Sequence, residues 1–164
     1  MKKILLSLLT ISAFTYSQAQ TTTASAAQTV TLNLQNQIDI SVVPGSATGT
    51  SFTFAATADY ASGLTNTNAS SFQVRSNKAW AVSVASAAAS FSGPAGTTMP
   101  ATALGVKLNG GTAASFTQLG TTAAAFTSGA RGTNTFAVDY NANPGFAYDA
   151  GTYTLSVVYT ATQQ

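Results

Sequence analysis

The sequence contains no cysteine and no histidine, and its four acidic residues are all aspartates. Without histidine and cysteine the chain cannot form a Ser-His-Asp triad, a Cys-His dyad or a zinc site built from these side chains. It also lacks the disulfides that brace many small secreted domains, so its stability must come from a packed core or from assembly. These absences predict a protein that is not an enzyme and that carries no metal or cofactor.

The four carboxylates are Asp39, Asp59, Asp139 and Asp149. A carboxylate pair could support hydrolysis of the glycosidase kind, and Asp139 and Asp149 flank the loop between the last two expected strands. The simpler interpretation is that Asp39 and Asp139 face solvent on strands, where they keep the protein soluble, and that Asp59 and Asp149 stabilise turns. The close Asp-x-Asp spacing of a calcium loop is absent.

The first residues have the layout of a secretory signal. Two lysines follow Met1, an apolar stretch covers residues 4–11, and small residues before Gln20 fit a cleavage site. The apolar stretch is too short to span a bilayer, and no later segment is apolar for long enough to anchor the chain in a membrane. We therefore expect residues 1–19 to be removed and the protein to be extracellular or on the cell surface, with transit through a periplasm as one route.

Removal of the signal would change the charge balance of the chain. Two of the six basic residues lie in the signal. The chain that remains would have four basic and four acidic residues, so its net charge would fall from +2 to zero. Four scattered cations do not form the cluster that displaces counterions from phosphates, so we expect no nucleic-acid partner. Zero net charge also favours self-association.

Hydrophobic side chains alternate along most of the chain, which is the period of half-buried β-strands. A flexible Thr/Ala/Ser-rich tail is expected over residues 20–28, followed by one domain over 29–164. Strands are expected at residues 30–34, 38–42, 51–55, 71–75, 80–84, 104–108, 116–119, 135–140 and 153–159, and loops at 57–69, 86–101 and before residue 135. This pattern predicts an all-β fold, an immunoglobulin-like Greek-key β-sandwich of about eight strands, and it leaves open whether the last strand is missing.

Two aromatic residues are candidates for a structural or a binding role. Trp80 shares the parity of Val82 and Val84, which favours a place in the core over an exposed platform for sugar. Tyr153 follows an Asp-x-Gly turn at the start of the last strand, a position typical of a tyrosine corner, in which the hydroxyl group caps backbone groups at a sheet edge.

The ending from Ala150 to Tyr159 resembles the last strand of fimbrial subunits and spore-coat-U-like proteins of the chaperone–usher class. Those proteins also end in an alternating strand introduced by a glycine, which is Gly151 here. The resemblance implies a sandwich that is short of one strand and is completed by the N-terminal segment of a neighbouring subunit.

A second resemblance covers about residues 72–161. Trp80-Ala81-Val82, the later Phe91, the strand at 104–108 and the same ending are similar in layout to WxL cell-wall-binding domains. This resemblance implies a monomeric module that binds cell-wall polymer or glycan, with Trp80, the nearby loops and Tyr148 as candidate contacts.

The sequence thus leaves two non-enzymatic functions open. The first is a fimbria-like or surface-layer subunit that assembles with itself by β-strand addition, with Val30, Leu32 and Leu34 as the donated residues. In the alternative interpretation, these three residues form the domain's own first strand. The second function is the wall-binding or glycan-binding module, whose partner would be a cell-surface polymer.

Overall fold

The computed structural model describes residues 22–112 and 116–164, so the expected signal and its cleavage site lie outside the described residues. Residues 22–37 belong to no helix or strand. A compact unit extends from Leu34 to Gln164 and contains all the strands. No helix in the described ranges is both long enough and apolar enough to cross a membrane.

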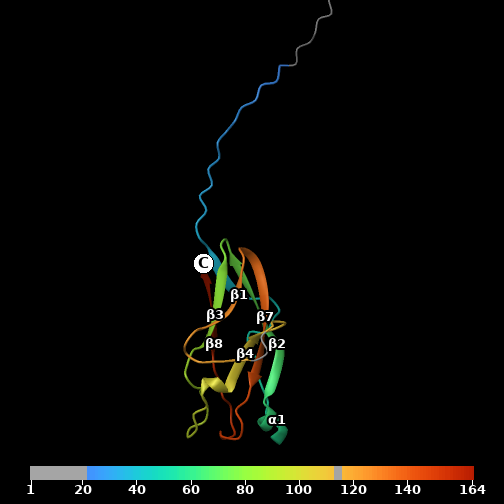
Figure 1. The fold of residues 1–164 in the computed structure, drawn as a ribbon, viewed down its shortest axis with the longest axis vertical. Coiled ribbons are helices and arrows are strands. Elements are labelled where there is room, and N and C mark those ends of the chain that lie inside the picture. The colour runs from blue at the N-terminus through green and yellow to red at the C-terminus, as the bar shows by residue number, and fades with distance from the viewer. Residues whose placement is uncertain (1–21, 113–115) are drawn as a thin grey trace, which may run out of the picture. The chain divides into compact units, whose positions relative to one another are not determined.

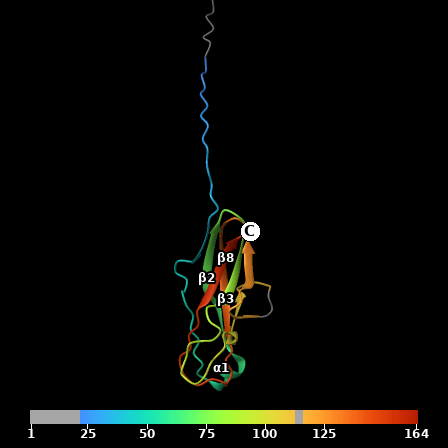
Figure 2. The same ribbon diagram turned by 90° about the vertical axis from the view of Figure 1, so that its left-hand side faces the viewer.

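The compact unit is a sandwich of two antiparallel sheets, which confirms the predicted all-β sandwich (Figure 1). The five-stranded sheet has the order β1 (Ile38–Val42), β2 (Leu64–Ser76), β7 (Gly132–Ala142), β4 (Leu104–Leu108) and β5 (Thr117–Gln118). The three-stranded sheet has the order β6 (Ala124–Gly129), β3 (Trp80–Ser86) and β8 (Val157–Gln163). A short helix, α1 (Thr57–Ser62), and a 3-10 turn at Ala101–Ala103 complete the described elements. In both ribbon views α1 lies at one end of the sandwich and the C-terminus at the other (Figure 2).

Strand β3 shows most clearly how the sequence pattern becomes a fold. Its alternate residues Trp80, Val82 and Val84 are buried between the sheets, and β6 and β8 pair with its two edges. The intervening residues are small, which suits the outer face of a strand that has neighbours on both sides.

Two expected loops contain strands in the structure. The loop predicted over residues 57–69 contains α1 and the first half of β2, and the loop expected before residue 135 contains β6. Both segments are rich in Ala, Ser, Thr and Asn, so they lack the large alternating side chains that indicate a strand. They form strands because β7 and β3 offer them backbone partners, and this tertiary pairing outweighs weak local propensity.

Two expected strands are absent and a third begins late, for the opposite reason. Residues 30–34 and 51–55 have the alternating pattern but form no strand, and β8 begins at Val157, four residues later than expected at Tyr153. These segments have the right side chains but lack a neighbouring strand along at least one edge. A strand is defined by its backbone partners. Among the described residues, 30–34 and 51–55 have no backbone–backbone hydrogen bond, and of residues 153–156, just before β8, only Thr154 and Ser156 have one.

The core between the sheets divides into two clusters. One surrounds Trp80 with Val74 and Val82, and Ile38, Ile40 and Ala161 are among the side chains that pack against it. The other contains Val106, Val138, Leu119 and Tyr140, and half-buried aromatic residues pack against it. The second cluster lies beneath the candidate site.

Candidate functional site

An open groove of about 830 Å³ runs along one side of the sandwich. Its walls are residues 47–54, which follow β1, and residues 151–157, which lead into β8. Its floor comes from both sheets and from the loop before β4, and it is mainly apolar: Phe72, Phe91, Met99, Leu104, Tyr140 and Tyr159. Because β1 and β8 are each an edge strand of their sheet, the groove occupies the place where a further strand would close the sandwich.

The wall that leads into β8 has a free backbone edge. Thr154 exchanges both backbone hydrogen bonds with Ser92, at 2.8 and 2.9 Å, and the carbonyl oxygen of Ser156 accepts from the N–H of Ala87. Backbone groups alternate in direction along an extended chain, so those of Tyr153 and Leu155 point to the opposite edge. No described residue bonds to them there. The side chains of both residues meanwhile line the groove.

The opposite wall is also without backbone partners. No described residue forms a hydrogen bond with the backbone N–H or C=O groups of residues 48–53. Phe52 and Phe54, on one face of this segment, line the groove. Two extended segments with free backbone groups therefore flank an apolar floor, which is the arrangement that accepts an added β-strand.

Two tyrosine hydroxyl groups are the polar groups of the mainly apolar groove floor. The hydroxyl groups of Tyr140 and Tyr159 lie 2.9 Å apart, and the Tyr159 ring packs against Phe72 with 4.5 Å between the ring centroids. Burial raises the pKa of both hydroxyl groups, and for Tyr159 the neighbouring Tyr140 raises the pKa further. Both groups therefore stay neutral at physiological pH, so the floor carries no charge.

The three candidate donor residues lie outside any strand. Val30 is 74% exposed, Leu32 79% and Leu34 85%. These are the three most exposed large hydrophobic side chains of the described residues. The structure therefore does not contain a first strand of the domain built from these residues. Large apolar side chains with this much exposure are typical of interaction segments when they lie close together.

Comparison with protein-family models and with curated proteins finds no match to this chain. The fold, the groove and the exposed segment are therefore the basis for inferring a function.

Trp80 lies in the core, as its parity predicts. It is 3% exposed, and its indole N–H donates to the carbonyl oxygen of Ala130 at 2.9 Å. Gly129 lies against the ring so closely that an added Cβ atom would be 2.4 Å from it. A ring enclosed in this way is not available for stacking on a sugar.

The residues around Tyr153 form the expected corner. The Tyr153 hydroxyl donates to the backbone oxygen of Asp149 at 2.9 Å and contacts the Thr97 hydroxyl at the same distance. Gly151 passes so close to Pro94 that a side chain would collide with the proline ring. Tyr148 is half-buried and lines the groove. Tyr148, Gly151 and Tyr153 therefore belong to the same groove wall, whereas Trp80 lies in the closed core.

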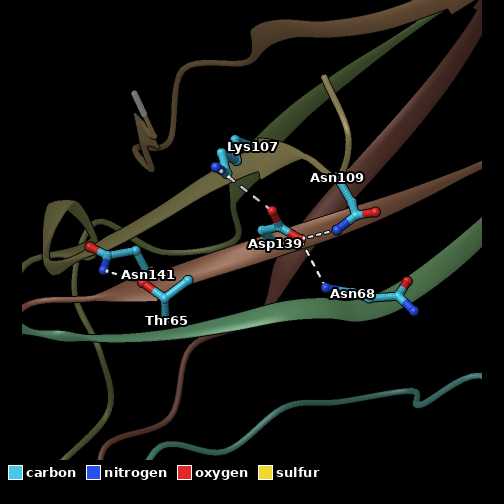
Figure 3. A network of polar contacts seen from close by, with 6 residues as sticks. All are labelled: Thr65, Asn68, Lys107, Asn109, Asp139 and Asn141. Atoms are coloured by element: carbon cyan, nitrogen blue, oxygen red, sulfur yellow. Dashed lines mark hydrogen bonds and ion pairs between the residues drawn. The ribbon is translucent and has the colours of Figure 1, made fainter. Parts of the chain in front are cut away.

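Asp139 is not a solvated surface carboxylate, which corrects the expectation from sequence. It is 3% exposed, and its Oδ1 atom accepts from the Asn109 side chain at 2.7 Å and from the backbone N–H of Asn68 at 2.8 Å (Figure 3). Lys107 Nζ lies 3.9 Å from the other carboxylate oxygen. Asn68 has a φ of 53° and lies where the pairing of β2 with β7 shifts register, so this network fixes a β-bulge.

The other three aspartates have separate places. Asp39 pairs with Arg75 on the neighbouring strand at 2.9 Å, with both side chains more than half exposed. Asp59 accepts from the backbone N–H groups of Ala56 and Ala55 at the start of α1, and these two bonds lower its pKa. Asp149 lies in the loop capped by Tyr153. In the described residues no three acidic side chains gather into a group that could hold a metal ion.

The groove is the main candidate feature that has no direct signal in the sequence. Its walls look like ordinary strands, because Phe52 and Phe54 or Tyr153 and Leu155 alternate as they would in a sheet. Only the three-dimensional pairing shows that each wall lacks a partner.

Proposed function

We propose that the protein is a secreted structural subunit of a cell-surface assembly, and that its copies join by β-strand addition. Residues 30–34 of one copy fill the groove of the next. The observation that carries the proposal is the match between an apolar groove with free backbone edges and an exposed segment that has no place in its own domain. A fimbria-like filament or a surface layer would have this architecture.

The donor and the groove also fit each other in detail. Val30, Leu32 and Leu34 point to one side of an extended chain about 7 Å apart, the repeat at which alternate strand residues enter pockets. The polar residues Thr31 and Asn33 would then face solvent on the outer side. The backbone groups of the donor would bond to the free edge at Tyr153 and Leu155. Complementation of this kind would stabilise a chain that has no cysteine.

The test begins with the mature chain, residues 20–164, which we expect to form filaments or oligomers in electron microscopy and size-exclusion chromatography. A shortened chain that begins at Gln35 should remain folded and become monomeric. A synthetic peptide of residues 28–36 should bind this monomer and raise its melting temperature. The matched control is the same peptide with Leu32→Asp, which should not bind, because a charge cannot enter the apolar floor without a partner.

Two results would count against the proposal. One is a mature chain that stays monomeric at all concentrations. The other is a shortened chain that assembles as well as the full one.

A binding module for wall polymer or glycan is the second candidate. The observation in its favour is an aromatic pair next to α1, where the Phe146 ring stacks on Tyr60 with 5.3 Å between centroids and Phe146 is 67% exposed. An exposed ring of this kind offers a flat apolar face on which the apolar face of a sugar would stack. A glycan array and a peptidoglycan pull-down test this candidate, with Phe146→Ala as the variant that should lose the signal. No binding in either assay would reject it.

A further inference from the structure

The tyrosine pair on the groove floor has a hydroxyl hydrogen for which the described part of the domain provides no acceptor. The Tyr140 and Tyr159 hydroxyl groups lie 2.9 Å apart, so one donates to the other, and among the described residues no further hydrogen bond reaches either group. Each hydroxyl group carries one hydrogen, so the second hydrogen has no partner there. While the groove is open, solvent accepts this hydrogen. A strand that fills the groove would exclude the solvent, and a buried donor without an acceptor is unfavourable, so the strand itself must supply an acceptor.

The pair lies at the inner end of the groove. Tyr159 is the last β8 residue that lines the groove, and Ala161, the next residue on the same face of β8, packs against the Trp80 cluster. At the other end, Tyr60 of α1 lines the groove. The sandwich is closed beyond the tyrosine pair, so a donor segment leaves the groove towards α1.

The direction of the donor follows from the residues that join it to its own domain. Asn77 Oδ1 accepts from the N–H of Gln37 at 3.0 Å, and Gln163 Nε2 donates to the carbonyl oxygen of Gln37 at 2.7 Å, so residues 35–37 stay with the domain that supplies the donor. That domain lies outside the α1 end of the groove that is filled. The N-terminal end of the donor therefore points to the tyrosine pair, and the donor runs antiparallel to residues 153–159.

Backbone hydrogen bonds alone leave the register of the donor open in steps of two residues, because a shift of two returns every side chain to the same face. Val30, Leu32 and Leu34 are aliphatic side chains of similar size, so they distinguish such registers weakly. A polar side chain on the same face would distinguish them strongly, since its burial is favourable only where it meets a partner.

Gln28 is the polar side chain that meets this requirement. It lies on the face of the donor that carries Leu32, towards the N-terminal end, and it is exposed in the free chain. Asn36 shares this face, but it lies within residues 35–37, which stay with their own domain. Gln28 is therefore the donor amide that enters the groove of the next copy.

The spacing of the two segments brings Gln28 to the tyrosine pair. When Leu32 lies opposite Leu155, antiparallel pairing places Gln28 opposite Tyr159, because four residues, about 13 Å, separate these positions in both segments. The side-chain carbonyl of Gln28 is then an acceptor beside the hydroxyl pair. A shift of two residues towards α1 would bring Ala26 to the pair instead, and would leave both the hydroxyl hydrogen and the Gln28 amide without a partner.

We propose that Gln28 sets the register of the added strand by accepting a hydrogen bond from the Tyr140–Tyr159 pair of the next copy. The inference rests on the proposed function, because it concerns the same groove and the same donor. It adds a specificity-determining residue outside the apolar triplet. A single buried polar residue fixes the register of coiled coils in a comparable way. Loss of one hydrogen bond of ordinary net strength shifts an equilibrium about fivefold, so loss of the Gln28 amide should lower the preference for one register by at least about fivefold.

Disulfide trapping in the full mature chain measures the register, because the natural chain has no cysteine. Leu155→Cys places one thiol on the groove wall, and the second is placed on the donor as Val30→Cys, Leu32→Cys or Leu34→Cys in three separate chains. Directly opposite residues lie close enough for a disulfide, whereas residues two positions away are about 7–8 Å apart. After oxidation, the ladder of joined copies on a non-reducing gel reports how often each donor residue lies opposite position 155.

Each of the three chains is then compared with its Gln28→Leu variant. The matched control is Asn33→Leu, which also replaces a donor amide with leucine, but on the face that points away from the groove. With Gln28, and with Asn33→Leu, we expect the strongest ladder from Leu32→Cys. With Gln28→Leu, the ratio of the Leu32→Cys ladder to the Val30→Cys ladder should fall by at least about fivefold.

The outcomes separate the inference from the proposed function. Equal ladders from the three donor positions in the natural background, or an unchanged ratio with Gln28→Leu, would overturn the inference and leave strand addition in place. The absence of a ladder from every chain would overturn the proposed function and the inference with it. These substitutions on the donor lie outside the strands of the domain, and fluorescence of the buried Trp80 verifies that each chain is folded.

A second comparison tests the partner of Gln28. In a chain with Tyr140→Phe and Tyr159→Phe, the groove has no hydroxyl hydrogen to satisfy, so Gln28→Leu should no longer lower the ratio of the two ladders. Removal of both partners of a buried hydrogen bond is nearly neutral, whereas removal of one is not. A fivefold fall in this background as well would show that Gln28 acts through other groups, and would overturn the inference.

Discussion

The two halves of the sandwich differ in how the edges of the two sheets meet. In the half around Trp80, side chains from β1 and β8 pack on the same cluster, and Gln163 bonds across to Gln37. In the other half, the continuations of β1 and β8 flank the open groove, and Phe52, Phe72 and Leu155 remain only partly buried. The same alternating pattern thus gives a closed core where the two edges meet and a binding groove where they do not.

The closed half should respond most strongly to loss of a side chain. Trp80→Ala removes the ring at the centre of its cluster, and we expect the free energy of unfolding to fall by about 3–5 kcal/mol. Urea denaturation followed by circular dichroism measures the change. A loss below about 1 kcal/mol would show that this half is not the closed core described here.

Added volume in the same half should cost less than removal of the ring. Gly129→Ala places a methyl group 2.4 Å from the Trp80 ring, so the indole or the strand must shift. We expect a loss of about 1–3 kcal/mol in the free energy of unfolding, with Gly120→Ala, where space is open, as the matched control. Equal stability of the two variants would show that the ring has room to move.

A truncation in the open half should affect assembly more than folding. Leu155→Ala should lower the free energy of unfolding of the free monomer by about 1 kcal/mol, because the side chain is only partly buried there. It should weaken binding of the 28–36 peptide by a larger factor, since the side chain becomes fully buried only when the donor is present. Melting curves with and without peptide test this difference, and an equal loss in both would argue that the groove is not filled by this segment.

The tyrosine pair gives the open half a distinctive pH response. Burial raises the pKa of Tyr140 and Tyr159 above the value of about 10 in an unfolded chain. The unfolded state therefore loses these protons first, so stability is fully present below pH 10 and is lost as the pH rises above it. Thermal melting between pH 7 and pH 12 measures the effect. Tyr159→Phe should make the fall of the melting temperature with pH shallower. An unchanged fall would show that other groups cause the loss of stability.

Sequence reasoning succeeded where side-chain pattern and backbone pairing agree. Trp80, Val82 and Val84 show their burial through parity alone, and the turn before Tyr153 indicates the corner that the hydroxyl group completes. Sequence reasoning failed where the side-chain pattern and the backbone pairing disagree. The six residues of β6 have one large side chain and still form a strand, whereas Phe52 and Phe54 alternate in a segment that has no strand partner. Which edges remain free depends on contacts between distant segments, and a local pattern does not contain that information.

The pairing of β3 with β8 also bears on how quickly the native state forms. Ser86 lies opposite Val157 and Trp80 opposite Gln163, so the partners are separated by 71 to 83 residues along the chain. Closing loops of that length carries a large entropic cost before the contacts compensate for it, and folding rates fall as such distant contacts increase. β8 cannot pair with β3 until the chain between them has closed into this long loop. We therefore expect the native state to form slowly.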